Sequence, residues 1–142
     1  KSIQSAFDKA IAVRDVVKKA IKVGVRADET MKQMDAALQA AGFRVIEFNR
    51  PNQDDKTDVT YGCHPVGNTG HDIGPSLTTW QPFQSTFVMH AQHMFSFEYF
   101  AYTPIAEWGG AKLRIPIEDD AILTDSGIQF LHPANYRLLV IK

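Results

Sequence analysis

Two stretches decide the fold: Met94-Phe95-Ser96-Phe97-Glu98-Tyr99-Phe100 and Leu113-Arg114-Ile115-Pro116-Ile117-Glu118. Both are rich in aromatic and β-branched residues, which is typical of strands. Successive side chains of a strand point to opposite faces of its sheet, so Glu98 points away from Phe97 and Glu118 points away from Ile117. If a hairpin through Gly109-Gly110 pairs the two stretches, both glutamates project from one face toward a common point.

A histidine flanked by glycines adds an imidazole to these carboxylates. His71 lies in Gly70-His71-Asp72-Ile73-Gly74, where glycine lets the backbone approach closely and leaves the ring accessible. Two buried carboxylates without a cation would repel each other, whereas a divalent ion removes that conflict. His71, Glu98 and Glu118 therefore form a candidate metal site. Taken singly, each glutamate also fits a solvated residue or an ion-pair partner of Arg114.

Two further histidines are candidates for catalytic work near these residues. His64 precedes the glycine-flanked segment, and His90 precedes the first strand stretch. Each of them, considered alone, also fits a histidine that is solvated or satisfied by neighbours. Three aspartates, Asp54, Asp55 and Asp58, are interpreted as solvated loop charges. Their spacing lacks the glycine and the distal glutamate of a calcium loop.

The rest of the pattern predicts an α+β fold, with two helices packed on a mostly antiparallel, curved sheet. Apolar residues recur every three or four positions over 2–22, and a second helix is expected to begin at a capping Thr30 and to end at Gly42. A short strand is expected at 43–48, followed by a loop at 49–60. The later strands are expected at 86–89, 93–102, 112–118, 121–124 and 137–141.

Composition excludes several classes of protein. The chain has 142 residues, of which 44% are hydrophobic, and a formal net charge of -1, as expected for one globular domain or part of one. Its 15 basic residues are scattered among 16 acidic ones, so nucleic acid is not an expected partner. No apolar run approaches the roughly 20 residues of a membrane span. The single cysteine, Cys63, excludes an internal disulfide, which favours the cytoplasm and leaves the periplasm open.

The motifs together resemble a known family. The Gly70–Gly74 segment, Met94-Phe95-Ser96-Phe97-Glu98 and Ile117-Glu118-Asp119-Asp120-Ala121-Ile122-Leu123-Thr124 are similar to the three C-terminal motifs of the pita-bread (creatinase/aminopeptidase) metallopeptidases. The Ile-Glu-Asp-Asp signature resembles the branch of Xaa-Pro aminopeptidases and prolidases. Ala41-Gly42-Phe43 also resembles the end of the second helix in that family, so the resemblance covers nearly the whole chain.

This resemblance implies a metallopeptidase that hydrolyses Xaa-Pro peptide bonds with a water activated by two metal ions. His71, Glu98 and Glu118 match metal ligands of the family, and Glu98 matches the residue that also moves protons. Manganese or cobalt are the expected ions, with zinc or iron as alternatives. The implied partner is a peptide with proline at its second position.

Three departures from the family pattern modify this expectation. The two remaining ligands of the family are aspartates on strands that precede the first helix, so residues 1–142 are expected to be the C-terminal portion of a catalytic domain. Thr78 stands where the family has a second, substrate-contacting histidine, a role that His64 or His90 could take. Pro116 stands where the family commonly has an arginine, and Arg114 lies on the same strand face. The isolated chain is therefore expected to bind metal weakly or at one position, to lack substantial peptidase activity, and to self-associate into a homo-oligomer.

Two alternatives remain open. The first is a non-catalytic pita-bread module that binds peptides or proteins in the same cleft. The second is a metal-independent amidinohydrolase resembling creatinase, which Thr78 makes less favourable because that enzyme depends on histidine chemistry.

Overall fold

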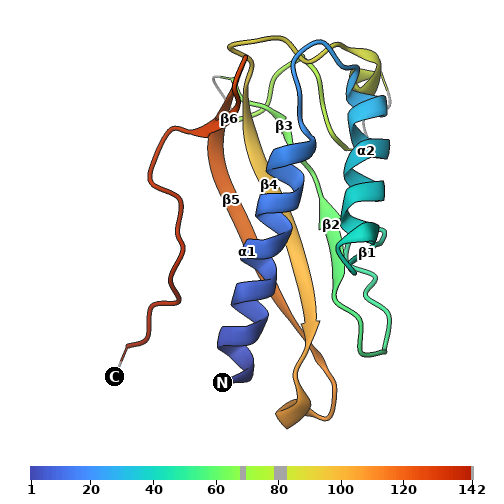
Figure 1. Cartoon of the computed structure of the whole chain (residues 1–142), viewed down its shortest axis with the longest axis vertical. Coiled ribbons are helices and arrows are strands. Elements are labelled where there is room, and N and C mark those ends of the chain that lie inside the picture. The colour runs from blue at the N-terminus through green and yellow to red at the C-terminus, as the bar shows by residue number, and fades with distance from the viewer. Residues whose placement is uncertain (68–69, 79–82, 142) are drawn as a thin grey trace.

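The structure, a computed structural model, describes residues 1–67, 70–78 and 83–141, and consists of two long helices followed by a sheet (Figure 1). Helix α1 spans Ser2–Ala20 and helix α2 spans Ala27–Ala40. The strands are β1 (Arg44–Val45), β2 (Asp58–Tyr61), β3 (His64–Pro65), β4 (Met94–Pro104), β5 (Lys112–Thr124) and β6 (Gly127–Phe130). Short 3-10 helices span Gln84–Thr86 and Ala106–Trp108. The predicted α+β class is confirmed. None of the helices in the described ranges is long and apolar enough to cross a membrane.

The sheet is mixed and mostly antiparallel. Within the described residues its strand order is β1-β2-β4-β5-β6, and β3 pairs with the beginning of β4. Only β1 and β2 run parallel to each other. The predicted hairpin is confirmed, because Gly109 and Gly110 adopt positive φ angles of 65° and 87° between β4 and β5. Pro116 fits into β5 because the register points its nitrogen, which carries no hydrogen, away from β4. No hydrogen bond between β4 and β5 is therefore lost.

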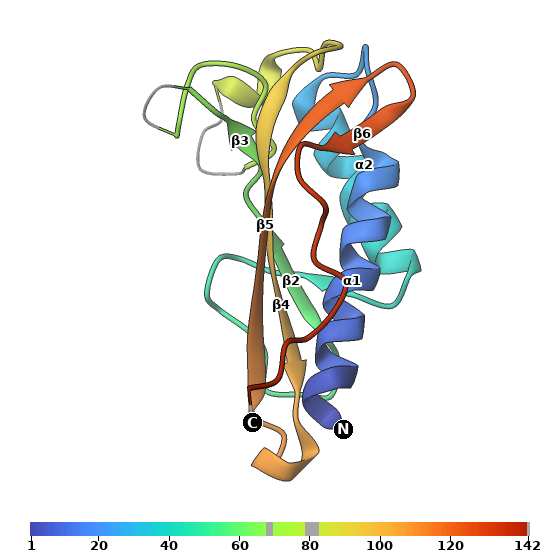
Figure 2. The same cartoon turned by 90° about the vertical axis from the view of Figure 1, so that its left-hand side faces the viewer.

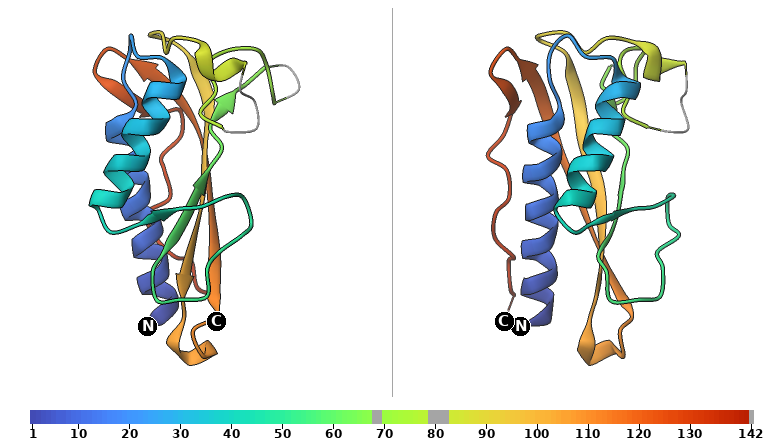
Figure 3. Two further views of the ribbon diagram at one scale, coloured as in Figure 1. Left: turned by 90° about the vertical axis from the view of Figure 1, so that its right-hand side faces the viewer. Right: turned by 45° about the vertical axis from the view of Figure 1, so that its right-hand side comes forward.

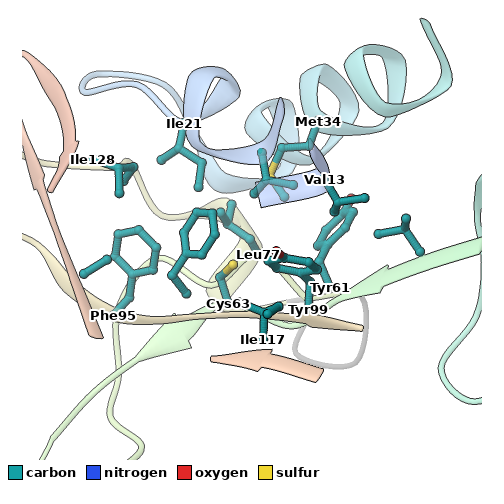
Figure 4. Close-up of a cluster of buried hydrophobic side chains, with 14 of the residues drawn as sticks. Val13, Ile21, Met34, Tyr61, Cys63, Leu77, Phe95, Tyr99, Ile117 and Ile128 are labelled. Carbon is teal, nitrogen blue, oxygen red and sulfur yellow. The ribbon is translucent and has the colours of Figure 1, made fainter. Parts of the chain in front are cut away.

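Both helices pack on one face of this sheet. Figure 2, which views the sheet on edge, shows α1 and α2 on the same side of β4 and β5. Phe95, Phe97 and Tyr99 of β4 point toward the helices, and the Tyr99 hydroxyl donates a 2.6 Å hydrogen bond to the Ala10 carbonyl. Side chains from helices and strands meet there in one apolar layer (Figure 4). Because strand side chains alternate, Ser96, Glu98 and Phe100 of β4 and Arg114, Pro116 and Glu118 of β5 lie on the opposite face, which we call the open face.

Several predicted boundaries were wrong. Thr30 does not cap α2; it is buried in the first turn, and its hydroxyl donates to the Arg26 carbonyl. The segment 86–89 is not a strand: Thr86 ends a 3-10 helix, and Val88 forms a single bridge with Arg26. The two strands expected at 112–118 and 121–124 form one continuous strand, because Asp119 and Asp120 pair with Phe97 and Ser96 of β4.

The C-terminal strand expected at 137–141 does not form. Leu139, Val140 and Ile141 are 80%, 75% and 98% exposed, so these apolar residues do not form a buried strand. The end of the chain instead runs beside α1 (Figure 1), and just before this segment the Arg14 guanidinium donates to the Asn135 carbonyl and lies over the Tyr136 ring, 4.1 Å from its centroid. The tertiary contacts of Arg14 therefore position the end of the chain, and the local sequence pattern does not predict these contacts.

The interpretation of Asp58 as a solvated loop charge was wrong, whereas Asp54 and Asp55 are exposed loop residues as expected. Asp58 begins β2, within the segment expected to be a loop, and is fully buried. Its carboxylate lies 2.6 Å from the Arg44 guanidinium and 2.8 Å from the Lys112 ammonium, and Asp54 contacts the same two cations. The loop that carries Asp54 projects beyond the sheet on the side away from the helices (Figure 3). These four charges tie it to β1, β2 and β5.

We predict that Lys112→Met lowers the free energy of unfolding by about 3 kcal/mol, because it leaves a buried carboxylate with one cation fewer. Lys56→Met is the matched control, since Lys56 is exposed and should change stability by less than about 0.5 kcal/mol. Urea denaturation of both variants measures the difference. Equal effects would contradict the role assigned to the buried network.

Candidate active site

Glu98 and Glu118 lie directly opposite each other on the open face. The register of β4 and β5 pairs them as cross-strand neighbours. The Ile105 N–H donates to the Ala111 carbonyl, so these two residues form a hydrogen-bonded pair between the two strand ends. The Leu131 N–H donates to the Asp120 carbonyl, so this carbonyl points away from β4. Because the two kinds of pair alternate along an antiparallel ladder, Glu98 and Glu118 form a pair without ladder hydrogen bonds. Side chains approach most closely at such pairs, with Cα atoms about 4.5 Å apart. The predicted convergence of the two carboxylates is therefore present in the backbone register.

His64 reaches this pair from β3. It is the register partner of Ser96, two residues before Glu98, and its Nε2 lies 3.9 Å from Glu98 Oε1. The other ring nitrogen, Nδ1, lies 3.1 Å from the Pro65 carbonyl. The His64 side chain is only 12% exposed and that of Glu98 is 22% exposed, so the contact is partly shielded from water.

His71 lies against His64. The two imidazole rings stack with centroids 4.1 Å apart and an interplanar angle of 15°. Gly70 precedes it with a φ of +83°, a backbone conformation that favours glycine, and His71 itself is exposed as expected. Gly74 follows where a Cβ would lie 3.0 Å from Pro65 and 3.1 Å from His93, so any side chain there would require these neighbours to shift by a few tenths of an ångström.

The electrostatics of the cluster centre on Glu98. Burial is the largest influence and raises the pKa of Glu98, and the nearby Glu118 carboxylate raises it further. His64 and His71 oppose this shift, because a positive charge on either ring favours the carboxylate form. His64, His71 and Glu118 therefore all act on the pKa of Glu98.

Ser96 is a functional candidate that the sequence argument missed. It is buried, and its hydroxyl donates a 3.1 Å hydrogen bond to Glu118 Oε1. This bond holds one oxygen of an otherwise exposed carboxylate in place. The alternation of β4 could have indicated it, because Ser96 shares the open face with Glu98.

The donor chemistry of this cluster fits a divalent metal ion, since imidazole and carboxylate are common ligands of manganese, cobalt, zinc and iron. The positions of the described side chains do not form a complete metal site. No group of three or more histidine, cysteine, aspartate or glutamate side chains in 1–67, 70–78 and 83–141 is arranged to hold an ion.

Other residues considered from the sequence lie elsewhere. His90 is exposed and lies near His93, whose pKa is lowered mainly by burial and further by the charge of His90. Thr78 is buried, and its hydroxyl has no hydrogen-bond partner among the described residues. Among the described residues Arg114 forms no ion pair with Glu98 or Glu118; its guanidinium lies over the Phe100 ring, 4.1 Å from the ring centroid.

Comparison with known proteins supports the fold. No protein-family model matches the sequence, and no curated protein matches it either. Among solved structures, the chain resembles the crystal structure of X-Pro aminopeptidase from Thermotoga maritima MSB8, with a TM-score of 0.67 and 18% sequence identity. The chain has the fold of part of an X-Pro aminopeptidase. The match covers 99% of this chain and 34% of that one, so the chain spans about a third of the solved structure. The pita-bread-like fold expected from the motifs is thus supported by structural similarity, which at this identity concerns the fold alone.

We predict that the pKa of Glu98 lies above the usual value of about 4.3 for glutamate. Because the folded pKa exceeds the unfolded one, the stability linked to Glu98 is fully present below about pH 4.3 and is lost as the pH rises through the folded pKa. Glu118→Gln should lower the Glu98 pKa by removing a neighbouring negative charge, while Glu47→Gln, at an exposed position, should leave it unchanged. NMR titration of the side-chain carboxyl carbons measures these values. An ordinary Glu98 pKa, unaffected by Glu118→Gln, would show that the two carboxylates do not meet.

Proposed function

We propose that this chain is part of a metal-dependent peptidase that hydrolyses Xaa-Pro peptide bonds. The observation that carries the proposal is the in-register pairing of Glu98 with Glu118, with His64 3.9 Å from Glu98 and His71 stacked on His64. The structural similarity to an X-Pro aminopeptidase supports it, because the same fold is known to accommodate that activity. The substrate proposed is a peptide with proline at its second position.

His71, Glu98 and Glu118 are the residues proposed to hold metal. When bound, divalent ions would lower the pKa of a coordinated water and polarise a peptide carbonyl. Glu98 is suited to hold or release a proton, because burial and Glu118 raise its pKa above the usual range of a glutamate. Ser96 fixes Glu118 through its hydrogen bond, and His64 faces Glu98 from the opposite strand edge, where it can donate to a carboxylate or to a bound peptide.

The proposal also concerns the extent of the protein. One imidazole and two carboxylates supply part of the ligand set expected from the resemblance, and the chain spans about a third of the solved X-Pro aminopeptidase. We infer that the remaining ligands, expected to be two aspartates, come from a part of the protein outside these 142 residues. The 142-residue chain alone should then bind metal weakly or at one position and should not cleave Xaa-Pro dipeptides efficiently.

We predict that Mn²⁺ binds the 142-residue chain at the open face, and that Glu98→Gln or Glu118→Gln weakens binding by at least about tenfold. Glu47→Gln is the matched control, since Glu47 is 78% exposed and pairs with Arg50 on the surface. Isothermal titration calorimetry and the electron paramagnetic resonance signal of free Mn²⁺ measure the affinities.

The outcomes separate the proposed function from its rivals. Loss of Mn²⁺ binding in both site variants and not in the control supports the peptidase. Equal Mn²⁺ affinity in all three variants, or no binding by the wild-type chain at millimolar Mn²⁺, contradicts a metal site at Glu98 and Glu118 and favours a non-catalytic peptide-binding module. Efficient cleavage of Xaa-Pro dipeptides by the chain alone would contradict the inference that ligands are supplied from outside it.

A further inference from the structure

A buried arginine lies on the helix side of the sheet, behind the candidate site. The side chain of Arg14, on α1, is 1% exposed, and its Nη1 atom lies 3.7 Å from Asp119 Oδ2 on β5. The same Nη1 donates a 3.0 Å hydrogen bond to the Asn135 carbonyl, and the guanidinium carbon lies 4.1 Å from the centroid of the Tyr136 ring. Burying a charge is costly unless it is paired, so Asp119 offsets much of the cost of burying Arg14.

The guanidinium depends strongly on this one carboxylate. Its Nε and Nη2 atoms are buried and have no hydrogen-bond partner among the described residues. Asp119 is the carboxylate that forms an ion pair with Arg14 in this part of the chain. Loss of either member would therefore leave a charge without its counterpart, and in the case of Arg14 that charge is fully enclosed.

Asp119 connects Arg14 to the candidate site through the strand. It follows Glu118 directly on β5, and successive side chains of a strand point to opposite faces. Glu118 thus points onto the open face, while Asp119 points to the side of the helices, where Arg14 meets it. Figure 2 shows α1 on that side of β5. The ion pair therefore acts on the strand immediately behind Glu118.

The backbone at Glu118 has few restraints of its own. Glu118 and Glu98 form a pair without ladder hydrogen bonds, so the backbone N–H and carbonyl of Glu118 point away from β4. On that outer side, within the described ranges, β6 pairs with β5 only from Ala121 onward. Two carboxylates that face each other also repel. Side-chain contacts of the adjoining residues are therefore needed to keep Glu118 in place.

We propose that Arg14 is a positioning residue for Glu118. By pairing with Asp119 it fixes β5 on the helix side, so that the Glu118 carboxylate stays within hydrogen-bond reach of Ser96 on the open face. The C-terminal segment takes part, because the carbonyl of Asn135 holds the guanidinium from the other side. This inference rests on the proposed function for the role of Glu118 as a metal ligand. It deepens that function by naming a residue on the opposite face of the sheet that supports the ligand.

The first test requires no metal. The Ser96 hydroxyl lies 3.1 Å from Glu118 Oε1, so a nuclear Overhauser cross-peak between the Ser96 β protons and the Glu118 γ protons reports whether the carboxylate is held. Arg14→Met and Asp119→Asn should each remove this cross-peak, whereas Arg14→Lys, which keeps the charge, should retain it in part. Asp15→Asn is the matched control, because it removes an exposed carboxylate next to Arg14 on α1, and it should leave the cross-peak unchanged.

The second test measures Mn²⁺ affinity by isothermal titration calorimetry. Arg14→Met and Asp119→Asn should each weaken Mn²⁺ binding by about tenfold, and the double variant should lose no more than either alone, because both changes remove one interaction. Lys112→Met separates positioning from stability, since Lys112 lies at the other end of β5 against Asp58. This destabilised variant should keep its Mn²⁺ affinity within about twofold of the wild type.

The cross-peak decides the proposal. Its persistence in Asp119→Asn and Arg14→Met, or its equal loss in Asp15→Asn, would overturn the positioning role. Equal loss of Mn²⁺ affinity in Lys112→Met would assign the effect to stability and would overturn it too. If Arg14→Met does not fold, Asp119→Asn alone decides.

The two proposals fail separately. No Mn²⁺ binding by the wild-type chain, together with loss of the cross-peak in Asp119→Asn, removes the peptidase and keeps the positioning role. Mn²⁺ binding at the two glutamates, with the cross-peak and the affinity unchanged in Arg14→Met and Asp119→Asn, does the reverse.

Discussion

The register of the β4–β5 hairpin is the constraint on which the rest of the structure depends. Shifting one strand by a single residue would turn Glu118 toward the helices and place Ile117 on the open face. The present register keeps Phe95, Phe97 and Tyr99 in the apolar layer under α1 and α2 while Glu98 and Glu118 stay together on the other side. The same alternation that buries the core therefore assembles the candidate site.

Two contacts outside the hairpin support this register. The Tyr99 hydroxyl bonds to the backbone of α1 at Ala10, which connects the middle of β4 to the first helix. Near the hairpin end, Lys112 of β5 is buried against Asp58 of β2, so a shift of β5 would separate an ion pair from which water is excluded. Burial of apolar side chains and of paired charges thus favours the same strand alignment.

Much of the fold could be predicted from sequence because alternation and helical spacing are local signals. The two helices, β4 and the facing of Glu98 and Glu118 follow from such patterns. Features that depend on distant partners could not be found this way. Asp58 reads as a loop residue unless Arg44 and Lys112 are known to surround it, and the apolar segment 137–141 reads as a strand although no strand accepts it in the described structure. The stacking of His71 on His64 and the bond from Ser96 to Glu118 are likewise tertiary, so the sequence could supply candidate residues but not their arrangement.

The most direct measurement of this account is the nuclear Overhauser effect between the Hα protons of Glu98 and Glu118. In an antiparallel sheet, residues of a pair without ladder hydrogen bonds bring their Hα protons closest together, at a Cα separation of about 4.5 Å. The register described here predicts a strong Hα–Hα cross-peak between these two glutamates. A strong cross-peak from Glu98 to Ile117 or Asp119 instead would show a shifted register, and the convergence of the two carboxylates would be refuted.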